Sequence, residues 1–127
     1  MKKDILGRLI TNSVMIEPHE LETVMFFVCR GEEIELIKPS NTPLNKNADF
    51  MMNGKVWEMK CPMGKSLLTV EHLFRKAVRQ SENVVFDLRH FRGDKKEAIK
   101  LLEKVFRLSR RARRMYVISD EKMVEFS

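Results

Sequence analysis

The amino-acid sequence predicts an α/β (α+β) fold of one domain, in which helices flank a mixed β-sheet. The chain has 127 residues, which suits a single domain with one modest core. Strand-like apolar runs alternate with amphipathic segments in the order α-β-β-β-α-β-α-β, and there is no internal repeat. We expect residues 1–16 to be a leader or linker segment and residues 17–127 to form the domain.

The composition narrows the class of protein. Hydrophobic residues make up 43% and charged residues 33% of the chain, which is typical of a soluble globular domain and excludes a disordered one. No run of about 18 apolar residues is present, so we expect no membrane partner. Cys29 and Cys61 form no CxxC pair, which favours a reducing cytoplasmic site of action with both cysteines buried. The net charge of +6 favours a polyanionic partner.

The first half of the chain contains a predicted helix and three predicted strands. Pro18 can occupy the first turn of a helix that ends before Gly31. Residues 32–39 alternate as a strand that Pro39 stops, and residues 40–47 are a polar loop. Two further strands follow as a hairpin around Asn53-Gly54, the strongest two-residue signal for a type I′ turn.

The second half alternates helices and strands. Apolar spacing predicts an amphipathic helix over 68–80, and the apolar segment 82–89 predicts a central strand. A turn at 90–94 leads to a long helix over 95–112. Residues 115–119 are a further strand, and residues 122–126 are a candidate for a short final one.

The hairpin carries charges that a simple strand pair does not need. Counting outward from Asn53-Gly54 places Asp49 opposite Glu58, and the two-residue period places Lys60 on the face of Glu58. Opposed carboxylates destabilise a sheet unless something neutralises them, and oxygen ligands favour Mg²⁺ or Mn²⁺. The alternative is a solvated face on which Lys55 and Lys60 offset the acids. The opposite face is a predicted core face of Phe50, Met52, Trp57, Met59 and Cys61.

The motif Asp49…Glu58-Met59-Lys60 resembles that of the PD-(D/E)XK nuclease superfamily, and the order α-β-β-β-α-β over residues 18–89 resembles its core. More narrowly, NADFMMNGKVWEMKCPMGKS and RKAVRQSENVVFDLR look like the C-terminal nuclease domains of CdiA-type contact-dependent growth inhibition toxins, many of which cut tRNA. One departure is Ala48, where the superfamily pattern has proline. Some inhibition toxins instead use a metal-free ribonuclease fold with His, Lys and Thr chemistry.

The resemblance implies roles for the hairpin residues. Asp49, Glu58 and the Met59 carbonyl would hold Mg²⁺ or Mn²⁺, and Lys60 would orient or deprotonate the attacking water, or stabilise the transition state. Glu20, at the edge of the first helix, is a further candidate acid, or alternatively a helix-start carboxylate favoured by the dipole.

Other candidates lie on the helices and loops. Gln80 is placed to reach substrate or Lys60, or alternatively to cap its helix or lie on the surface. Arg89 could hold a phosphate, or form a salt bridge with Asp87. The remaining candidates for nucleic-acid binding are Lys65 and Ser66 in the loop after the hairpin, and the basic cluster Arg107, Arg110, Arg111, Arg113 and Arg114.

The sequence and the resemblance together predict a metal-dependent endonuclease, with RNA (tRNA by resemblance) favoured over DNA. A noncatalytic nucleic-acid-binding protein of the same fold and an interaction protein that docks an acidic partner are the alternatives. The resemblance also implies an acidic immunity protein as a partner and delivery into a target cell. The oligomeric state stays open.

Overall fold

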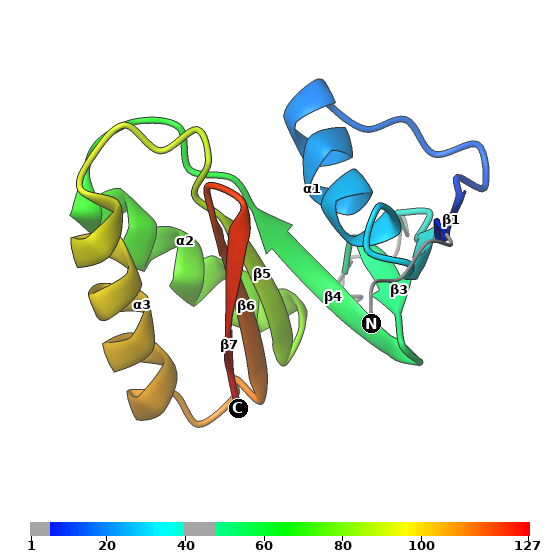
Figure 1. Ribbon diagram of the computed structural model, residues 1–127. Coiled ribbons are helices and arrows are strands. Elements are labelled where there is room, and N and C mark those ends of the chain that lie inside the picture. Colours follow the sequence, from blue (N-terminus) through cyan, green and yellow to red (C-terminus); the bar gives the residue numbers. More distant parts are fainter. Residues whose placement is uncertain (1–5, 40–47) are drawn as a thin grey trace, which may run out of the picture.

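The computed structural model describes residues 6–39 and 48–127, and it contains one mixed β-sheet flanked by helices (Figure 1). The predicted fold class is confirmed. The described elements are β1 (Arg8–Ile10), α1 (Pro18–Val28), β2 (Glu33–Leu36), β3 (Phe50–Met52), β4 (Lys55–Lys60), α2 (Leu67–Gln80), β5 (Asn83–Asp87), α3 (Lys95–Leu108), β6 (Arg114–Ser119) and β7 (Lys122–Phe126).

The strands lie in the sheet in their sequence order, from β1 to β7. β4, β5 and β6 are parallel and are connected through α2 and α3, whereas β2–β3, β3–β4 and β6–β7 are antiparallel. In Figure 1, α2 and α3 lie to the left of the sheet and α1 lies to its upper right. The predicted central strand, β5, is buried along its whole length, as expected for a strand covered on both faces.

The helices cover two separate hydrophobic cores. Alternate side chains of β5 enter different cores: Val85 packs with residues of α1, while Val84 and Phe86 pack with residues of α2 and α3. The predicted core face of the hairpin joins the α1 core, where Trp57 stacks on Tyr116 with ring centroids 4.6 Å apart. Glu58 and Lys60 pair in register with Val84 and Phe86, so they lie on the opposite face.

The structure differs from the predicted elements in three places. Residues 8–10, within the expected leader or linker, form β1 and pair in parallel with β2. Gly7 approaches the chain so closely that a Cβ there would lie 1.7 Å from the Glu32 carbonyl oxygen. The predicted helix over 95–112 is too long, because Ser109 Oγ accepts the N–H groups of Arg111 and Ala112 and ends α3 at Leu108.

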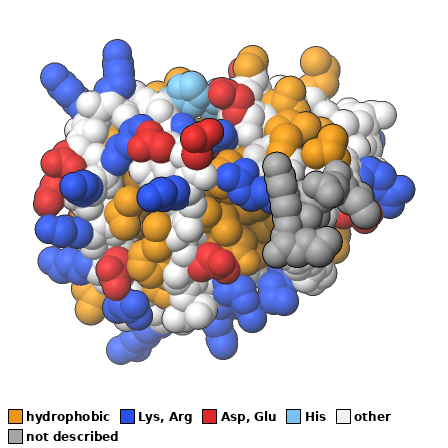
Figure 2. Space-filling model, viewed as in Figure 1, with side chains coloured by type: hydrophobic (Ala, Val, Ile, Leu, Met, Phe, Trp, Pro, Cys, Tyr) orange, Lys and Arg blue, Asp and Glu red, His pale blue; other side chains and the backbone are white. Residues whose placement is uncertain are grey.

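The third difference concerns the cysteines, since Cys29 is exposed rather than buried, and Cys61 is half-buried. The expected loop over 40–47 lies outside the described residues. Among the described helices, none is long and apolar enough to span a membrane. Figure 2 shows hydrophobic side chains at the surface between α3 and the strands β6 and β7, with Lys and Arg side chains around them.

Candidate active site

The β3–β4 hairpin has the predicted register. Phe50 pairs with Trp57 and Met52 with Lys55. Asn53 and Gly54 have φ angles of 55° and 73°, which are the left-handed values that a type I′ turn requires. The Asn53-Gly54 turn signal therefore predicted the pairing of every residue in the β3–β4 ladder correctly.

Asp49 lies at the point where the regular ladder ends. Its N–H donates to the carbonyl of Trp57 at 2.9 Å, and its carboxylate Oδ2 accepts the N–H of Met59 at 2.8 Å. The side chain thus takes the place of a main-chain acceptor on the edge of β4. Asp49 lies close to Glu58, as predicted, but is held by this side-chain bond rather than by continued strand pairing.

Glu58 is a buried acid with an unsatisfied oxygen. The residue is 5% exposed, and its Oε1 has no hydrogen-bond partner among the described residues. Its Oε2 lies 3.2 Å from Lys60 Nζ, and the Lys60 side chain is 23% exposed. The three predicted side chains Asp49, Glu58 and Lys60 therefore meet at one site, with Lys60 reaching solvent.

Burial and mutual repulsion change the acidity of the two carboxyl groups. Burial and the charge of Asp49 raise the pKa of Glu58 to about 8, although the Lys60 ammonium opposes this rise. Burial also raises the pKa of Asp49, and the negative charge of Glu20 adds to this effect, while the Met59 N–H opposes it. Near neutral pH the pair consequently carries fewer than two negative charges, as expected for two adjacent buried acids whose ionisations are coupled.

The donor set fits a hard divalent cation. The described residues contain no group of three His, Cys, Asp or Glu side chains that could hold a metal. A site here would instead use two carboxylates and a main-chain carbonyl. The N–H and C=O of one strand residue point to the same neighbouring strand, so the Met59 carbonyl lies on the Asp49 side of β4. Mg²⁺ commonly binds one or two carboxylates and keeps several waters, which matches such a site and its partnerless Oε1.

The two further candidate residues, Glu20 and Gln80, lie in different places. Glu20 Oε1 accepts the N–H of Glu17 at 3.0 Å, so it caps α1, and its charge also acts on Asp49. Gln80 ends α2 and lines a hollow of about 300 Å³ with Arg110 and Arg113. The structure brings Glu20 toward the carboxylate pair and places Gln80 with the arginines.

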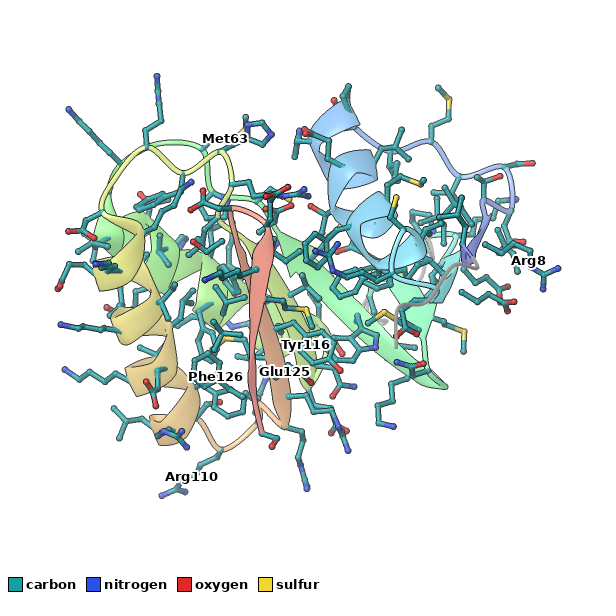
Figure 3. The ribbon with its side chains drawn as sticks, viewed as in Figure 1. Arg8, Met63, Arg110, Tyr116, Glu125 and Phe126 are labelled. Carbon is teal, nitrogen blue, oxygen red and sulfur yellow. The ribbon has the colours of Figure 1, made fainter. Side chains whose placement is uncertain are left out.

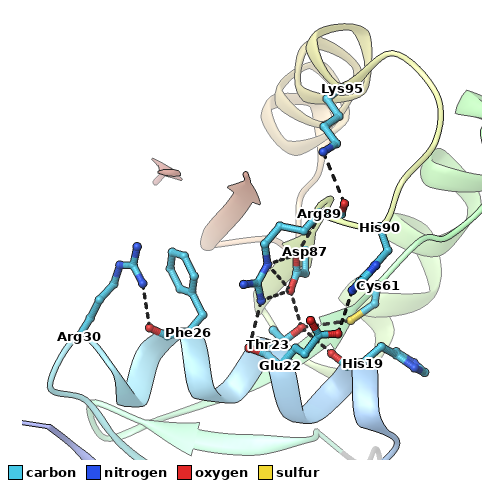
Figure 4. Close-up of polar contacts among 10 residues, drawn as sticks. All are labelled: His19, Glu22, Thr23, Phe26, Arg30, Cys61, Asp87, Arg89, His90 and Lys95. Carbon is cyan, nitrogen blue, oxygen red and sulfur yellow. Dashed lines mark hydrogen bonds and ion pairs between the residues drawn. The ribbon is translucent and has the colours of Figure 1, made fainter. Parts of the chain in front are cut away.

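A buried polar cluster ties α1 to the carboxyl end of β5 (Figure 4). Asp87 Oδ2 accepts hydrogen bonds from Thr23 Oγ1 and Arg89 Nη2, both at 2.7 Å, and Arg89 Nη2 also donates to the Glu22 carbonyl at 3.0 Å. Although burial opposes it, the bonds from Arg89 and Thr23 hold the pKa of Asp87 below its usual value. Arg89 therefore forms the salt bridge with Asp87 that the sequence allowed.

Thr23 and Cys61 extend this cluster toward β4. Cys61 Sγ lies 3.3 Å from Thr23 Oγ1, and burial raises the pKa of the thiol to about 11, so the thiol is protonated near neutral pH. Sequence reasoning missed Thr23. Local spacing does not mark this residue, because its burial and its contact with Asp87, 64 residues away, arise only in the folded chain.

The predicted nucleic-acid-binding residues lie at two opposite ends of the molecule. Figure 3 shows Met63 at one end and Arg110 at the other. Lys65 and Ser66 lie near Met63 in the chain; Lys65 is exposed, whereas Ser66 Oγ accepts the N–H of Thr69 and caps α2. The arginines follow α3 at the far end.

The five arginines of the predicted cluster differ in their contacts. Arg107 pairs with Glu103 at 3.1 Å, and Arg114 Nη1 donates to Asn83 Oδ1 at 3.3 Å. The other three are exposed and form no ion pair within residues 6–39 and 48–127; they are Arg110, Arg111 and Arg113. These three, with Arg79 beside them, border the hollow that Gln80 lines.

A family model decides the relationship of the chain. The model of the contact-dependent growth inhibition CdiA C-terminal domain matches residues 46–124, which include the whole β3–β4 hairpin. The chain belongs to this family. Asp49, Glu58 and Lys60 all lie within the matched region, whereas α1 with Glu20 and Thr23 precedes it.

A solved structure extends the likeness over nearly the whole chain. The domain is similar to a chain in the CdiA-CT/CdiI toxin and immunity complex from Burkholderia pseudomallei, with 15% identity and a TM-score of 0.73. The similarity covers 95% of this chain and 99% of that chain, and at this identity it is a likeness of fold. Comparison with curated proteins gave no match.

Proposed function

We propose that this CdiA C-terminal domain is a metal-dependent endonuclease of PD-(D/E)XK type, which acts as a contact-dependent growth inhibition toxin. RNA, and tRNA by the family resemblance, is the favoured substrate over DNA. The observation that carries the proposal is the buried Glu58 carboxylate, with an unpartnered oxygen, between Asp49 and Lys60. A purely structural ion pair has no need of a second buried acid beside it.

Each residue of the hairpin has a role in this proposal. Asp49, Glu58 and the Met59 carbonyl would hold Mg²⁺ or Mn²⁺, which when bound supplies an acidified water and neutralises charge on the phosphate. The Met59 N–H keeps the Asp49 carboxylate beside Glu58. Lys60 extends from Glu58 toward solvent, where its ammonium would orient the attacking water or stabilise the negative charge of the transition state. Glu20 would adjust the charge of the site through Asp49.

The exposed arginines would bind the substrate backbone away from the cut. Val56 lies two residues before Glu58, about 7 Å along the strand. Its carbonyl accepts the Ser81 hydroxyl at 2.8 Å, and the adjacent Glu82 carbonyl accepts the Arg113 N–H at 2.7 Å. A short series of hydrogen bonds thus connects β4, which carries Glu58, to the loop over 109–113 that carries Arg110, Arg111 and Arg113. We call this loop the arginine loop. In this proposal Lys65 and Arg89, which follow the carboxyl ends of β4 and β5, would contact only a substrate that extends to that end of the sheet.

Cleavage assays test the proposed activity directly. Total tRNA and plasmid DNA are incubated with the domain in Mg²⁺ or in EDTA. We expect Mg²⁺-dependent products from tRNA, and their loss in Asp49→Asn, Glu58→Gln and Lys60→Met. Glu125→Gln, an exposed acid on β7, is the matched control and should cut like wild type. Products from neither nucleic acid, or full activity of Glu58→Gln, would contradict the proposal.

A noncatalytic nucleic-acid-binding protein is the second candidate, and the exposed, unpaired arginines favour it independently of the carboxylates. It predicts retarded mobility of RNA without products in either metal condition. The relative from Burkholderia pseudomallei was solved as a toxin and immunity complex, which supports the further proposal that this domain has an immunity protein and is delivered into a target cell.

A further inference from the structure

A long groove runs between α2 and α3, which lie side by side on one face of the sheet (Figure 1). Its central part has a volume of about 570 Å³. The apolar side chains that line this part are Phe74, Val78, Leu101, Val105 and Leu108, and the basic ones are Arg75, Arg79, Lys104 and Arg111. An apolar floor with a basic border distinguishes this surface from the carboxylate site.

The groove continues at both ends. A hollow of about 400 Å³ lined by Leu67 and Leu68 shares Leu101 and Lys104 with the central part. Leu68 is 76% exposed and Leu108 is 74% exposed, so large apolar side chains stand at both ends of the groove. Each helix has 14 residues, which gives the groove a length of about 21 Å. These exposed leucines at both ends of the groove offer apolar surface that a partner can cover.

The basic side chains that border the groove outnumber the acidic ones at the end where α2 and α3 terminate. The two glutamates that line the groove are neutralised within their own helices, since Glu71 pairs with Arg75 and Glu97 lies 3.6 Å from Lys100. Arg79, Lys104 and Arg111 have no ion-pair partner in the described part of the chain. The surplus positive charge lies beside Leu108, where α2 and α3 end.

These features favour a protein over a nucleic acid as the occupant. Phosphates need only the cations, and bases need exposed aromatic rings for stacking. The one aromatic side chain that lines the central part is Phe74, which is only 3% exposed, so the apolar surface on offer is aliphatic. An amphipathic helix uses both properties, because its apolar stripe fills an aliphatic groove while its acidic side chains meet the basic border.

We propose that the α2–α3 groove binds an acidic amphipathic helix of about four turns from a protein partner. Apolar side chains spaced i, i+3, i+4 and i+7 pack on Leu101, Val105 and Leu108. Acidic side chains at one end of that helix pair with Lys104 and Arg79. The groove shares Arg79 and Arg111 with the arginine hollow but contains neither Asp49 nor Glu58, so this docking surface stands whether or not the domain is a nuclease.

A peptide-binding experiment on the full chain tests this assignment. The probe is a fluorescein-labelled helical peptide of about 14 residues, with leucines on one face and glutamates toward one end. A scrambled peptide of the same composition is its control. We expect anisotropy to report binding of the first peptide only. Leu108→Gln and Lys104→Gln should each weaken binding roughly tenfold, whereas Met15→Gln, 94% exposed, and Lys96→Gln should leave it unchanged.

Four outcomes would overturn the assignment. They are failure of the peptide to bind, equal binding of the scrambled peptide, unchanged affinity in Leu108→Gln, and displacement of the peptide by a single-stranded RNA whose own binding does not depend on Leu108. Sedimentation of the free chain adds a fifth, since a dimer that Leu108→Gln dissociates would show that a second copy occupies the groove. Leu108 is largely exposed, so its substitution leaves the fold intact and keeps these results interpretable.

Discussion

The carboxylate of Asp49 accepts the main-chain N–H of Met59 at 2.8 Å, across the end of the β3–β4 ladder. This bond places the side chain of a residue outside the strand against the edge of β4, next to the buried Glu58. The same bond keeps the pKa of Asp49 lower than burial alone would make it. The two acids interact with each other but differ in their other partners: Asp49 has a main-chain donor, and Glu58 has Lys60.

Stability of the metal-free domain should fall as the pH rises through the pKa of Glu58. The folded state raises this pKa from 4.5 to about 8, so between these values the folded chain holds a proton that the unfolded chain has lost. A pKa difference of one corresponds to about 1.4 kcal/mol. We expect the free energy of unfolding in EDTA to fall by about 2–3 kcal/mol between pH 6 and pH 9.

Glu58→Gln, which mimics the protonated acid, should remove most of this pH dependence, and urea unfolding at several pH values measures it. Glu125→Gln is the control and should keep the wild-type slope. An identical pH profile in wild type and Glu58→Gln would show that Glu58 titrates normally in the folded state.

The arginine loop should govern the salt dependence of nucleic-acid binding. Arg110 and Arg113 are exposed and border the hollow at the end of α2, so Arg110→Gln/Arg113→Gln should remove about two phosphate contacts. Binding of a labelled RNA, measured in EDTA to prevent cleavage, should weaken, and its dependence on log salt should become shallower by about 1.4. Arg107→Gln is the matched control because Glu103 already pairs with Arg107. Equal effects of the double variant and the control would rule out a special role for the loop.

The contact between Thr23 and Asp87 should stabilise the docking of α1. Thr23→Val keeps the shape but removes one of the two donors that lie 2.7 Å from the buried Asp87 Oδ2, so only Arg89 still binds this oxygen. The loss of a hydrogen bond to a charged group should cost about 1–3 kcal/mol of unfolding free energy. Asp87→Asn should lose a similar amount above pH 4, because the lowered pKa of Asp87 stabilises the fold fully above its unfolded value of 3.8, and this contribution is lost only as the pH falls through the lower pKa of the folded state.

Asp120→Asn is the comparison for this cluster. Asp120 also forms an ion pair, with Lys95 at 2.9 Å, but its side chain is 77% exposed, so the change should be within about 0.5 kcal/mol. Thermal melts of the three variants at pH 7 and at a series of lower pH values provide the measurement. Loss of stability in Asp120→Asn as large as in Thr23→Val would remove the distinction between buried and exposed pairs.

Gly54→Ala should destabilise the hairpin through its backbone conformation. Gly54 has φ 73°, and a Cβ there would meet no atom within 4 Å, so the cost comes from the left-handed conformation and not from a clash. We expect a loss of about 1 kcal/mol. Gly64→Ala, also in open space but without a positive φ, should have a much smaller effect on the melting temperature. Equal losses at the two positions would contradict the turn assignment.

Local patterns were enough to predict much of the fold and the carboxylate site. Asn53-Gly54 specifies a two-residue turn, and counting two residues per pleat from that turn aligned the ladder as far as Phe50. Local signals likewise predicted the ends of α1, through Pro18 and Gly31, the apolar periodicity of α2, and the buried run of β5. These features depend on neighbours within a few residues, which a sequence displays directly.

Contacts between distant segments decided the rest. β1 pairs with β2 across 25 residues, and Thr23 meets Asp87 across 64, so neither partner is visible from local spacing. The same holds for the arginines. The fold brings Arg114 into hydrogen-bond contact with Asn83, whereas Arg110 and Arg113 are exposed. The acidity of Glu58 was also beyond local reasoning. Its pKa follows from desolvation by packed elements, and burial is a property of the assembled fold, not of the residues on either side.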